Sequence, residues 1–145
     1  MSASNVELIR RIFPSGIDMA AVMRSDDPAG AFQADPDAVA PDLEVKFAAS
    51  PAGAAGFEGR GLEGLVEGWQ DWLIPWESYV ITVDEFVDAG DKVVTLVRIR
   101  GRTSRDGVEV EHRPAAVWTV GDGQVTAVTF FLDRDEAFEF AGIGG

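Results

Sequence analysis

Cysteine is absent from this chain of 145 residues, and histidine occurs once, at His112. Without cysteine there are no disulfide bonds, no thiolate nucleophiles and no cysteine-ligated zinc or iron–sulfur clusters. A single imidazole also limits metal chemistry, because histidine is the other common ligand of zinc. We therefore expect the protein to work without a metal and without any other cofactor.

Basic side chains are scarce, with 12 Lys and Arg against 25 Asp and Glu, which gives a formal net charge of −13. That charge repels nucleic-acid backbones and anionic lipid surfaces, so we expect neither as a partner. Long apolar runs are also missing, whereas a membrane-spanning helix needs about 18 consecutive apolar residues. The first residues do not read as a secretory signal. These patterns predict a soluble, cytoplasmic protein.

The length and the apolar share of 46% are typical of one globular domain, so residues 1–145 are expected to form a single domain. Apolar residues at helical spacing predict four helices. These cover residues 4–13, 17–23, 62–76 and 134–141. A strand is expected at 43–48, whereas 25–41 is predicted to be irregular and 49–61 a loop.

From position 79 onward the apolar period changes from helical to alternating. Four runs follow this pattern, at 79–88, 92–103, 108–120 and 124–132. Asp106-Gly107 and Asp122-Gly123 lie between runs and suit two-residue hairpin turns, which need positive φ at both central positions. The sequence therefore predicts an α+β fold whose second half is an antiparallel meander.

Counting outward from these turns assigns each residue of the meander to one face. One face is predicted to be the apolar core, and it carries Val97, Ile99, Gly101, His112, Pro114, Ala116, Trp118, Ala127, Thr129, Phe131 and Asp133. The back face carries arginines and glutamates beside a second apolar group, made of Val94, Leu96, Val117, Val128, Phe130 and Leu132. Because that group needs cover, we expect a homodimer through the back face of the sheet.

The same register sets His112 directly opposite Asp133. An imidazole held by a carboxylate can act as a general base, and so can the carboxylate alone in a dry pocket. Each residue also has a structural interpretation. Asp133 can cap the helix at 134–141, with Glu136 three residues later, and His112 near a strand end can be simply hydrogen-bonded. A single β-bulge would break the proposed pairing.

Aromatic residues form the most distinctive set in the sequence. As a ligand site they would form a wall for a flat apolar molecule, and the candidate substrate-binding residues are Trp69, Trp72, Trp118, Phe131 and Thr129. As a structural set they would be ordinary core. One motif is set aside: residues 59–64 match G-x-G-x-x-G, but the dinucleotide site needs a strand directly before it and a parallel strand after its helix.

Several stretches carry a family resemblance. They are Gly59-Arg60-Gly61-Leu62-Glu63-Gly64 running into Trp69-Gln70-Asp71-Trp72, Asp88-Ala89-Gly90-Asp91-Lys92-Val93-Val94, Ala116-Val117-Trp118-Thr119-Val120 before Asp122-Gly123, and Leu132-Asp133-Arg134-Asp135-Glu136-Ala137. In these and in the order of its elements, most of the chain resembles the SnoaL-like families of the nuclear transport factor 2-like superfamily. Residues 25–41 look like an insertion. The resemblance implies a conical fold, in which a strongly curved antiparallel sheet, N-terminal helices and one Trp-rich helix enclose a pocket, usually in a homodimer.

That superfamily includes polyketide cyclases, ketosteroid isomerases, epoxide hydrolases and dehydratases, and also proteins without known chemistry. In the cyclases an aspartate at the end of the last strand is the catalytic acid/base, and Asp133 resembles it. The position of Ala116 is often polar in relatives, so alanine here argues for lost or altered chemistry. Three hypotheses follow: a cofactor-free isomerase, cyclase or hydrolase that uses Asp133 and His112 on a small apolar molecule, a noncatalytic ligand-binding module, and a dimeric partner-binding domain.

Overall fold

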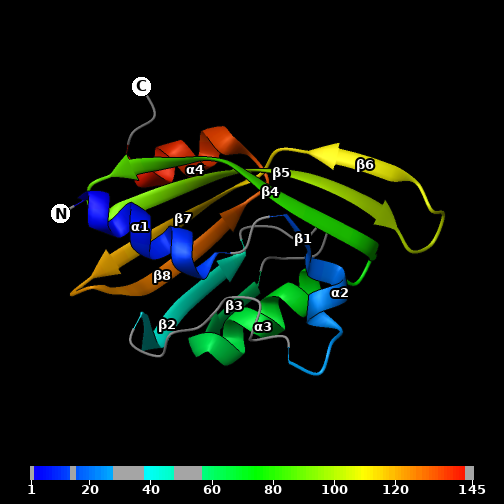
Figure 1. The fold of residues 1–145 in the computed structure, drawn as a ribbon, viewed down its shortest axis with the longest axis horizontal. Coiled ribbons are helices and arrows are strands. Elements are labelled where there is room, and N and C mark those ends of the chain that lie inside the picture. The colour runs from blue at the N-terminus through cyan, green and yellow to red at the C-terminus, as the bar shows by residue number, and fades with distance from the viewer. Residues whose placement is uncertain (1, 14–15, 28–37, 48–56, 143–145) are drawn as a thin grey trace.

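The computed structural model describes residues 2–13, 16–27, 38–47 and 57–142 (Figure 1). Within these ranges one eight-stranded sheet runs in the order β1-β4-β5-β7-β8-β2-β3, with β6 also paired to β5. The sheet is antiparallel except where β2 lies parallel to β8. The elements are α1 (Ser2–Ile12), β1 (Ile17–Asp18), α2 (Met19–Met23), β2 (Val39–Phe47), β3 (Phe57–Arg60), α3 (Gly61–Trp72), β4 (Trp76–Ala89), β5 (Lys92–Thr103), β6 (Glu109–His112), β7 (Ala115–Gly121), β8 (Gln124–Phe131) and α4 (Arg134–Ala141).

The helices cover both faces of this curved, unclosed sheet. Buried side chains of α1, α2 and α3 pack in one large core against the face that we call the inner face. Helix α4 packs on the other side, the back face, where Ala137 joins a smaller apolar cluster with Val94, Leu96, Val117 and Phe131. In Figure 1, α4 lies on the side of the strands away from α3. The predicted α+β fold with a curved antiparallel sheet is confirmed.

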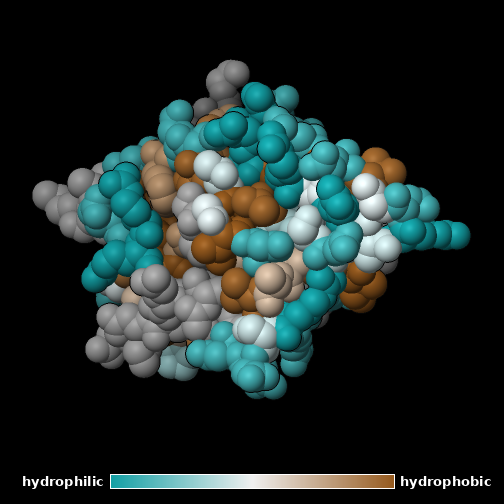
Figure 2. Space-filling model, turned by 45° about the vertical axis from the view of Figure 1, so that its right-hand side comes forward, coloured by the Kyte–Doolittle hydropathy of each residue, from teal (hydrophilic) through white to brown (hydrophobic). Residues whose placement is uncertain are grey.

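The apolar residues of the back face therefore receive cover from the chain itself. Val94, Leu96 and Val117 are buried beneath α4. This helix therefore supplies part of the cover that a second copy of the chain was predicted to supply. The face in Figure 2 is largely hydrophilic toward its margins, and hydrophobic side chains gather near its middle and at its right-hand edge. In the described part of the chain, no helix is long and apolar enough to cross a membrane.

Several predicted boundaries are corrected by identifiable residues. The helix predicted over 62–76 ends at Trp72, because Pro75 disfavours helical backbone before it, and Trp76 already begins β4. The strand predicted over 108–120 is divided into β6 and β7, since Pro114 cannot donate to the ladder. Ile17 and Asp18 pair with β4 before α2 begins.

Two stretches predicted to be irregular contain strands. β2 begins at Val39 within the stretch 25–41, and β3 lies within the predicted loop 49–61 and pairs with β2. Residues 28–37 and 48–56 lie outside the described residues.

In the hairpin between β7 and β8 the predicted turn is confirmed, but the predicted strand register is wrong. Gly121 pairs with Gln124 around Asp122 (φ 54°) and Gly123 (φ 76°), both in the left-handed region as a type I′ turn requires. Val120 then pairs with Val125, whereas Thr119 pairs with Ala127. The extra residue on β8 is Thr126, which forms a β-bulge.

This bulge exchanges the two faces of β8 beyond it, because a slip of one residue turns every later side chain over. Val128 and Phe130 join the inner core, although they were predicted on the back face. Thr129 pairs with Val117, and Phe131 joins the back-face cluster. The prediction that Thr129, Phe131 and Asp133 share the inner face with His112 is therefore wrong.

In the hairpin between β5 and β6 the loop is longer than predicted, but each residue lies on the predicted face of the sheet. Thr103 N–H donates to the Val108 carbonyl at 3.0 Å, so four residues rather than two separate the strands. The shift is even, and His112 pairs with Ile99 on the inner face.

Candidate functional site

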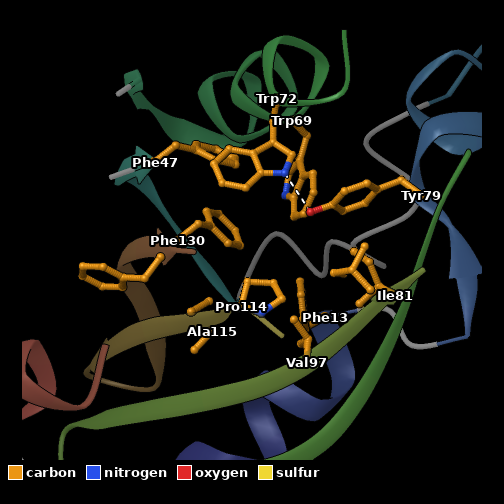
Figure 3. Close-up of a pocket in the computed structure, with 13 residues that line it drawn as sticks. Phe13, Phe47, Trp69, Trp72, Tyr79, Ile81, Val97, Pro114, Ala115 and Phe130 are labelled. Atoms are coloured by element: carbon orange, nitrogen blue, oxygen red, sulfur yellow. Dashed lines mark hydrogen bonds between the residues drawn. The ribbon is translucent and has the colours of Figure 1, made fainter. Parts of the chain in front are cut away.

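A small cavity lies beneath α3, between that helix and the inner face of the sheet (Figure 3). Side chains from α3, β4, β5 and β8 point toward one another around it, with Phe13 beyond the end of α1. The lining residues are Phe13, Phe47, Trp69, Trp72, Tyr79, Ile81, Val97, Ile99, Pro114, Ala115, Ala116, Phe130 and Phe131. Among these, only Tyr79 and the two indole N–H groups are polar, so the cavity suits an apolar molecule.

The cavity is nearly closed in this structure. The space open to the centre of a water-sized sphere is about 20 Å³, which is enough for one water molecule. Ligand sites for drug-sized molecules usually measure several hundred Å³. An organic ligand would therefore enter only if some of the surrounding side chains move apart.

The upper wall of the cavity is aromatic, as the sequence predicted. Trp69 and Trp72 project from neighbouring turns of α3, and the Phe47 ring lies within 5.6 Å and 5.1 Å of their ring centroids. Phe130 stacks on Phe47 with a centroid distance of 4.5 Å and an interplanar angle of 26°. Phe130 was predicted on the back face, and the bulge at Thr126 turns it to the inner face instead.

Of the other three predicted substrate-binding residues, two lie outside the cavity lining and one borders the cavity. Trp118 is buried in the core beside the cavity, where its Nε1 donates to Thr95 Oγ1 at 3.1 Å. Thr129 borders a groove on the back face together with Phe140. Phe131 borders the cavity, but its ring packs against Phe140 at 5.4 Å.

A line of hydrogen bonds runs from α3 to β6 along one side of the cavity. Trp72 Nε1 donates to the Tyr79 hydroxyl at 2.9 Å, and the same hydroxyl lies 3.4 Å from His112 Nε2. Because Tyr79 accepts from Trp72, its own proton is free to point at Nε2, which assigns the His112 proton to Nδ1. Trp76 stacks on His112 with ring centroids 6.2 Å apart and an interplanar angle of 12°, and it also contacts the Tyr79 ring at 5.3 Å.

Burial acts on both titratable groups of this line. Desolvation raises the pKa of the Tyr79 hydroxyl far above its ordinary value, and the hydrogen bond from Trp72 offsets only part of that effect. Desolvation also lowers the pKa of His112 below 6.5. Both groups are therefore neutral at pH 7, as a phenol donor and an imidazole acceptor.

Tyr79 is the functional candidate that sequence reasoning missed. It is the only tyrosine of the chain, and it is 1% exposed at the start of β4. It alternates with Ile81, whose side chain is also buried. A buried tyrosine hydroxyl normally needs a hydrogen-bond partner, which is the signal that could have singled it out.

The predicted pair of His112 and Asp133 is not formed. His112 pairs with Ile99 in the sheet, and the bulge removes the register that would have set Asp133 opposite it. Asp133 is exposed, caps α4 by accepting from the Asp135 N–H at 2.8 Å, and does not line the cavity. The helix-capping alternative is thus the one observed, and we assign Asp133 no catalytic role.

One cluster of charged side chains, made by Asp84, Arg98 and Arg134, lies outside the cavity. Arg98 donates to Asp84 at 3.0 Å, and Arg134 lies 3.5 Å from the same carboxylate and donates to the Val97 carbonyl. The Arg98 hydrogen bond lowers the pKa of Asp84. Among the described residues, no group of three His, Asp or Glu side chains is placed to hold a metal ion.

Comparison with known families shows which family the chain belongs to. The family model for the SnoaL-like domain matches residues 18–128, which is most of the sequence. The chain belongs to the SnoaL-like family. No curated protein matches this SnoaL-like sequence.

Solved structures share the fold of this SnoaL-like chain over nearly its whole length. A protein assigned as a SnoaL-like polyketide cyclase from Jannaschia sp. CCS1 is 20% identical, with 99% of this chain and 94% of that chain covered and a TM-score of 0.64. TerC, co-crystallised with polyporic acid, is 21% identical, with 96% and 98% covered and a TM-score of 0.64. An NTF2-like protein from Burkholderia thailandensis E264 is 25% identical, with 88% and 89% covered and a TM-score of 0.64.

Proposed function

We propose that this SnoaL-like domain binds a small, largely apolar molecule in the cavity beneath α3. The observation that carries the proposal is the lining itself, in which aromatic and aliphatic side chains surround a single hydroxyl, that of Tyr79. TerC, which has the same fold, was co-crystallised with the small molecule polyporic acid. In the present chain, binding would need the cavity to widen beyond about 20 Å³.

Filling the cavity tests this proposal. Ala116 lines it, whereas Ala127 lies on the back face of the neighbouring strand, so Ala116→Leu and Ala127→Leu make a matched pair. The probe is indane, an apolar bicyclic hydrocarbon, and binding is followed by NMR of side-chain methyl groups. Indane should shift the methyl resonances of Ile81 and Ile99 in the wild type and in Ala127→Leu, but not in Ala116→Leu. Absence of any such shift in the wild type would refute the proposal.

A second candidate function is cofactor-free acid/base chemistry on a carbonyl compound, and the line from Trp72 through Tyr79 to His112 favours it. His112 does not line the closed cavity, so ligand entry would first have to open its contact with Tyr79, and His112 Nε2 would then take a proton from the carbon beside the carbonyl group. The electron pair would move to the carbonyl oxygen, which the Tyr79 hydroxyl would hold by turning its proton from Nε2 to the ligand. Nε2 would then return the proton to the same carbon, which inverts that centre, or to the γ-carbon of an unsaturated ketone, which shifts the double bond.

Hydrogen–deuterium exchange at the α-carbon of 1-indanone in D₂O tests this chemistry, because exchange reports the same proton removal. General acid–base catalysis predicts an acceleration of about a hundredfold or more. Tyr79→Phe and His112→Asn should each abolish it. If the wild-type protein leaves the exchange at the buffer rate, the catalytic candidate fails, whereas the binding proposal stands on its own test.

A homodimer through the back face is also proposed, although α4 already covers part of that face. Leu132 is 37% exposed, and Phe140 of α4 is 52% exposed beside a back-face groove of about 530 Å³. A second copy of the chain packed on this face would bury both side chains. Phe140→Ser should shift a dimer toward monomer in sedimentation analysis, and a monomeric wild type would refute the dimer.

A further inference from the structure

The indole N–H of Trp69 is an unused hydrogen-bond donor in the wall of the cavity. Trp69 is 4% exposed, and its Nε1 is fully buried without an acceptor in the described part of the chain. A buried N–H without a partner costs about 1–3 kcal/mol and calls for an explanation. Since Trp69 lines the cavity, an acceptor placed there by a ligand would supply the missing partner.

The cavity has more donors than acceptors. Its lining contains no carboxylate, no side-chain amide and no serine or threonine hydroxyl. The two indoles and Tyr79 contribute three side-chain donor hydrogens; that of Trp72 goes to the Tyr79 oxygen and that of Tyr79 faces His112 Nε2, so the Trp69 N–H is the one left over. A ligand that fits this surplus must bring an oxygen that accepts, rather than a group that donates.

The position of Trp69 determines the part of the cavity in which the accepting oxygen of a ligand would lie. The Trp69 ring centroid is 6.0 Å from that of Tyr79 and 5.2 Å from that of Phe130. Figure 3 shows the Trp69, Trp72 and Tyr79 side chains converging on the same corner of the cavity, opposite Pro114 and Val97. The polar corner and the apolar floor thus face each other across the site.

From this geometry, which rests on the proposed binding function, we propose that Trp69 anchors the ligand. The indole N–H donates to a carbonyl oxygen, and the ligand is a compact planar ketone or quinone whose hydrocarbon part lies against the apolar floor. Trp69 is then a binding residue that discriminates between a carbonyl compound and the matching hydrocarbon. Desolvated donors of this kind reject analogues that lack the acceptor.

Trp76 provides an internal control. Its Nε1 is also buried without an acceptor in the described residues, and its side chain is 6% exposed, but it does not line the cavity. Trp69→Phe and Trp76→Phe therefore remove the same group from equally buried positions. Only the first should change ligand selectivity.

The experiment compares 1-indanone with indane, which share their rings and differ in the carbonyl oxygen. Indole N–H resonances are recorded in ¹⁵N-labelled protein, where the four tryptophans give separate signals that Trp→Phe variants assign. The Trp69 N–H should move downfield with 1-indanone and not with indane. Loss of one hydrogen bond predicts that Trp69→Phe weakens 1-indanone binding about threefold to tenfold and leaves indane unaffected.

The possible results separate this inference from the binding proposal. Unchanged selectivity in Trp69→Phe, or an equal loss in Trp76→Phe, overturns the anchor while ligand binding stands. Equal affinity of the wild type for both compounds overturns it in the same way. If neither compound perturbs any resonance of the cavity lining, the anchor and the proposed function both fall.

Discussion

The hydroxyl of Tyr79 lies 3.4 Å from Nε2 of His112, and this contact joins the cavity wall to β6. Tyr79 is held from the other side by Trp72 of α3 at 2.9 Å. The only histidine of the chain therefore meets a tyrosine, and not the carboxylate of Asp133 that the predicted hairpin register set opposite it. The following predictions test this arrangement and the fold that creates it.

The hydrogen bond between Trp72 and Tyr79 should appear as a coupling in a double-mutant cycle. Tyr79→Phe leaves the buried Trp72 N–H without its acceptor, so it should lower the free energy of unfolding by about 1–3 kcal/mol. In a Trp72→Phe background the same change should cost less, by about 1 kcal/mol. Urea denaturation measures all four proteins. Strictly additive losses would show that the bond contributes nothing.

His112 should titrate below its ordinary pKa of 6.5, because desolvation disfavours its charged form. The unfolded chain then binds this proton at higher pH than the folded chain does. The resulting stability is fully present above about pH 6.5 and decreases as pH falls through that value toward the folded pKa. Proton NMR of the single imidazole gives the midpoint directly.

The acidity of the chain makes salt an essential control for that titration. A net charge of −13 acts against desolvation by favouring protonation, so the measurement belongs at about 0.15 M salt, where distant charges are screened. A midpoint at or above 6.5 would contradict the burial of His112. In His112→Asn, the pH dependence of stability between about pH 5 and 7 should become smaller.

Asp133 should behave as a helix cap and not as a catalytic group. Asp133→Ala removes the acceptor for the Asp135 N–H and should cost about 1 kcal/mol of unfolding free energy. Asp133→Asn keeps an accepting oxygen and should cost much less. Both variants should bind 1-indanone as the wild type does. A large loss of binding in Asp133→Asn, with stability unchanged, would restore Asp133 to the site.

The bulge at Thr126 should tolerate deletion, whereas a deletion beyond it should not be tolerated. Deleting Thr126 leaves Ala127 opposite Thr119, so Val128 and Phe130 stay on the inner face and the hairpin becomes regular. Deleting Thr129 instead turns Phe130 toward the back face, and exposing such a side chain costs about 1.5–3 kcal/mol against a total stability of about 5–15 kcal/mol. Urea unfolding monitored by tryptophan fluorescence should give a higher midpoint for the Thr126 deletion than for the Thr129 deletion, and the opposite order would contradict the bulge.

The strongest local signals in the sequence predicted most of the fold. Alternation from position 79, the Asp122-Gly123 turn and the helical period of α3 each agree with the structure, since each depends on neighbouring residues alone. The end of α4 at Gly142, in the left-handed conformation (φ 79°), follows the same logic. These elements bring the tryptophans of α3 over the inner face of the sheet, where the cavity lies.

The site was less predictable because one extra residue decides it. Nothing in the sequence around Thr126 marks a bulge, yet the bulge turns Phe130 into the cavity and Thr129 out of it. The partner of His112 likewise depends on β4, which lies two strands away along the sequence and fixes Tyr79 by long-range pairing. Register errors of this kind propagate along a strand, whereas errors in a single helix boundary do not.

The central claim, that the cavity beneath α3 is a ligand site, is tested most directly by a crystal structure of the protein grown with 1-indanone. The account predicts electron density for the ligand between Trp69, Tyr79 and Phe130, with its oxygen within about 3 Å of Trp69 Nε1. Ligand density confined to the back-face groove beside Thr129 and Phe140, with the cavity still closed, would contradict it.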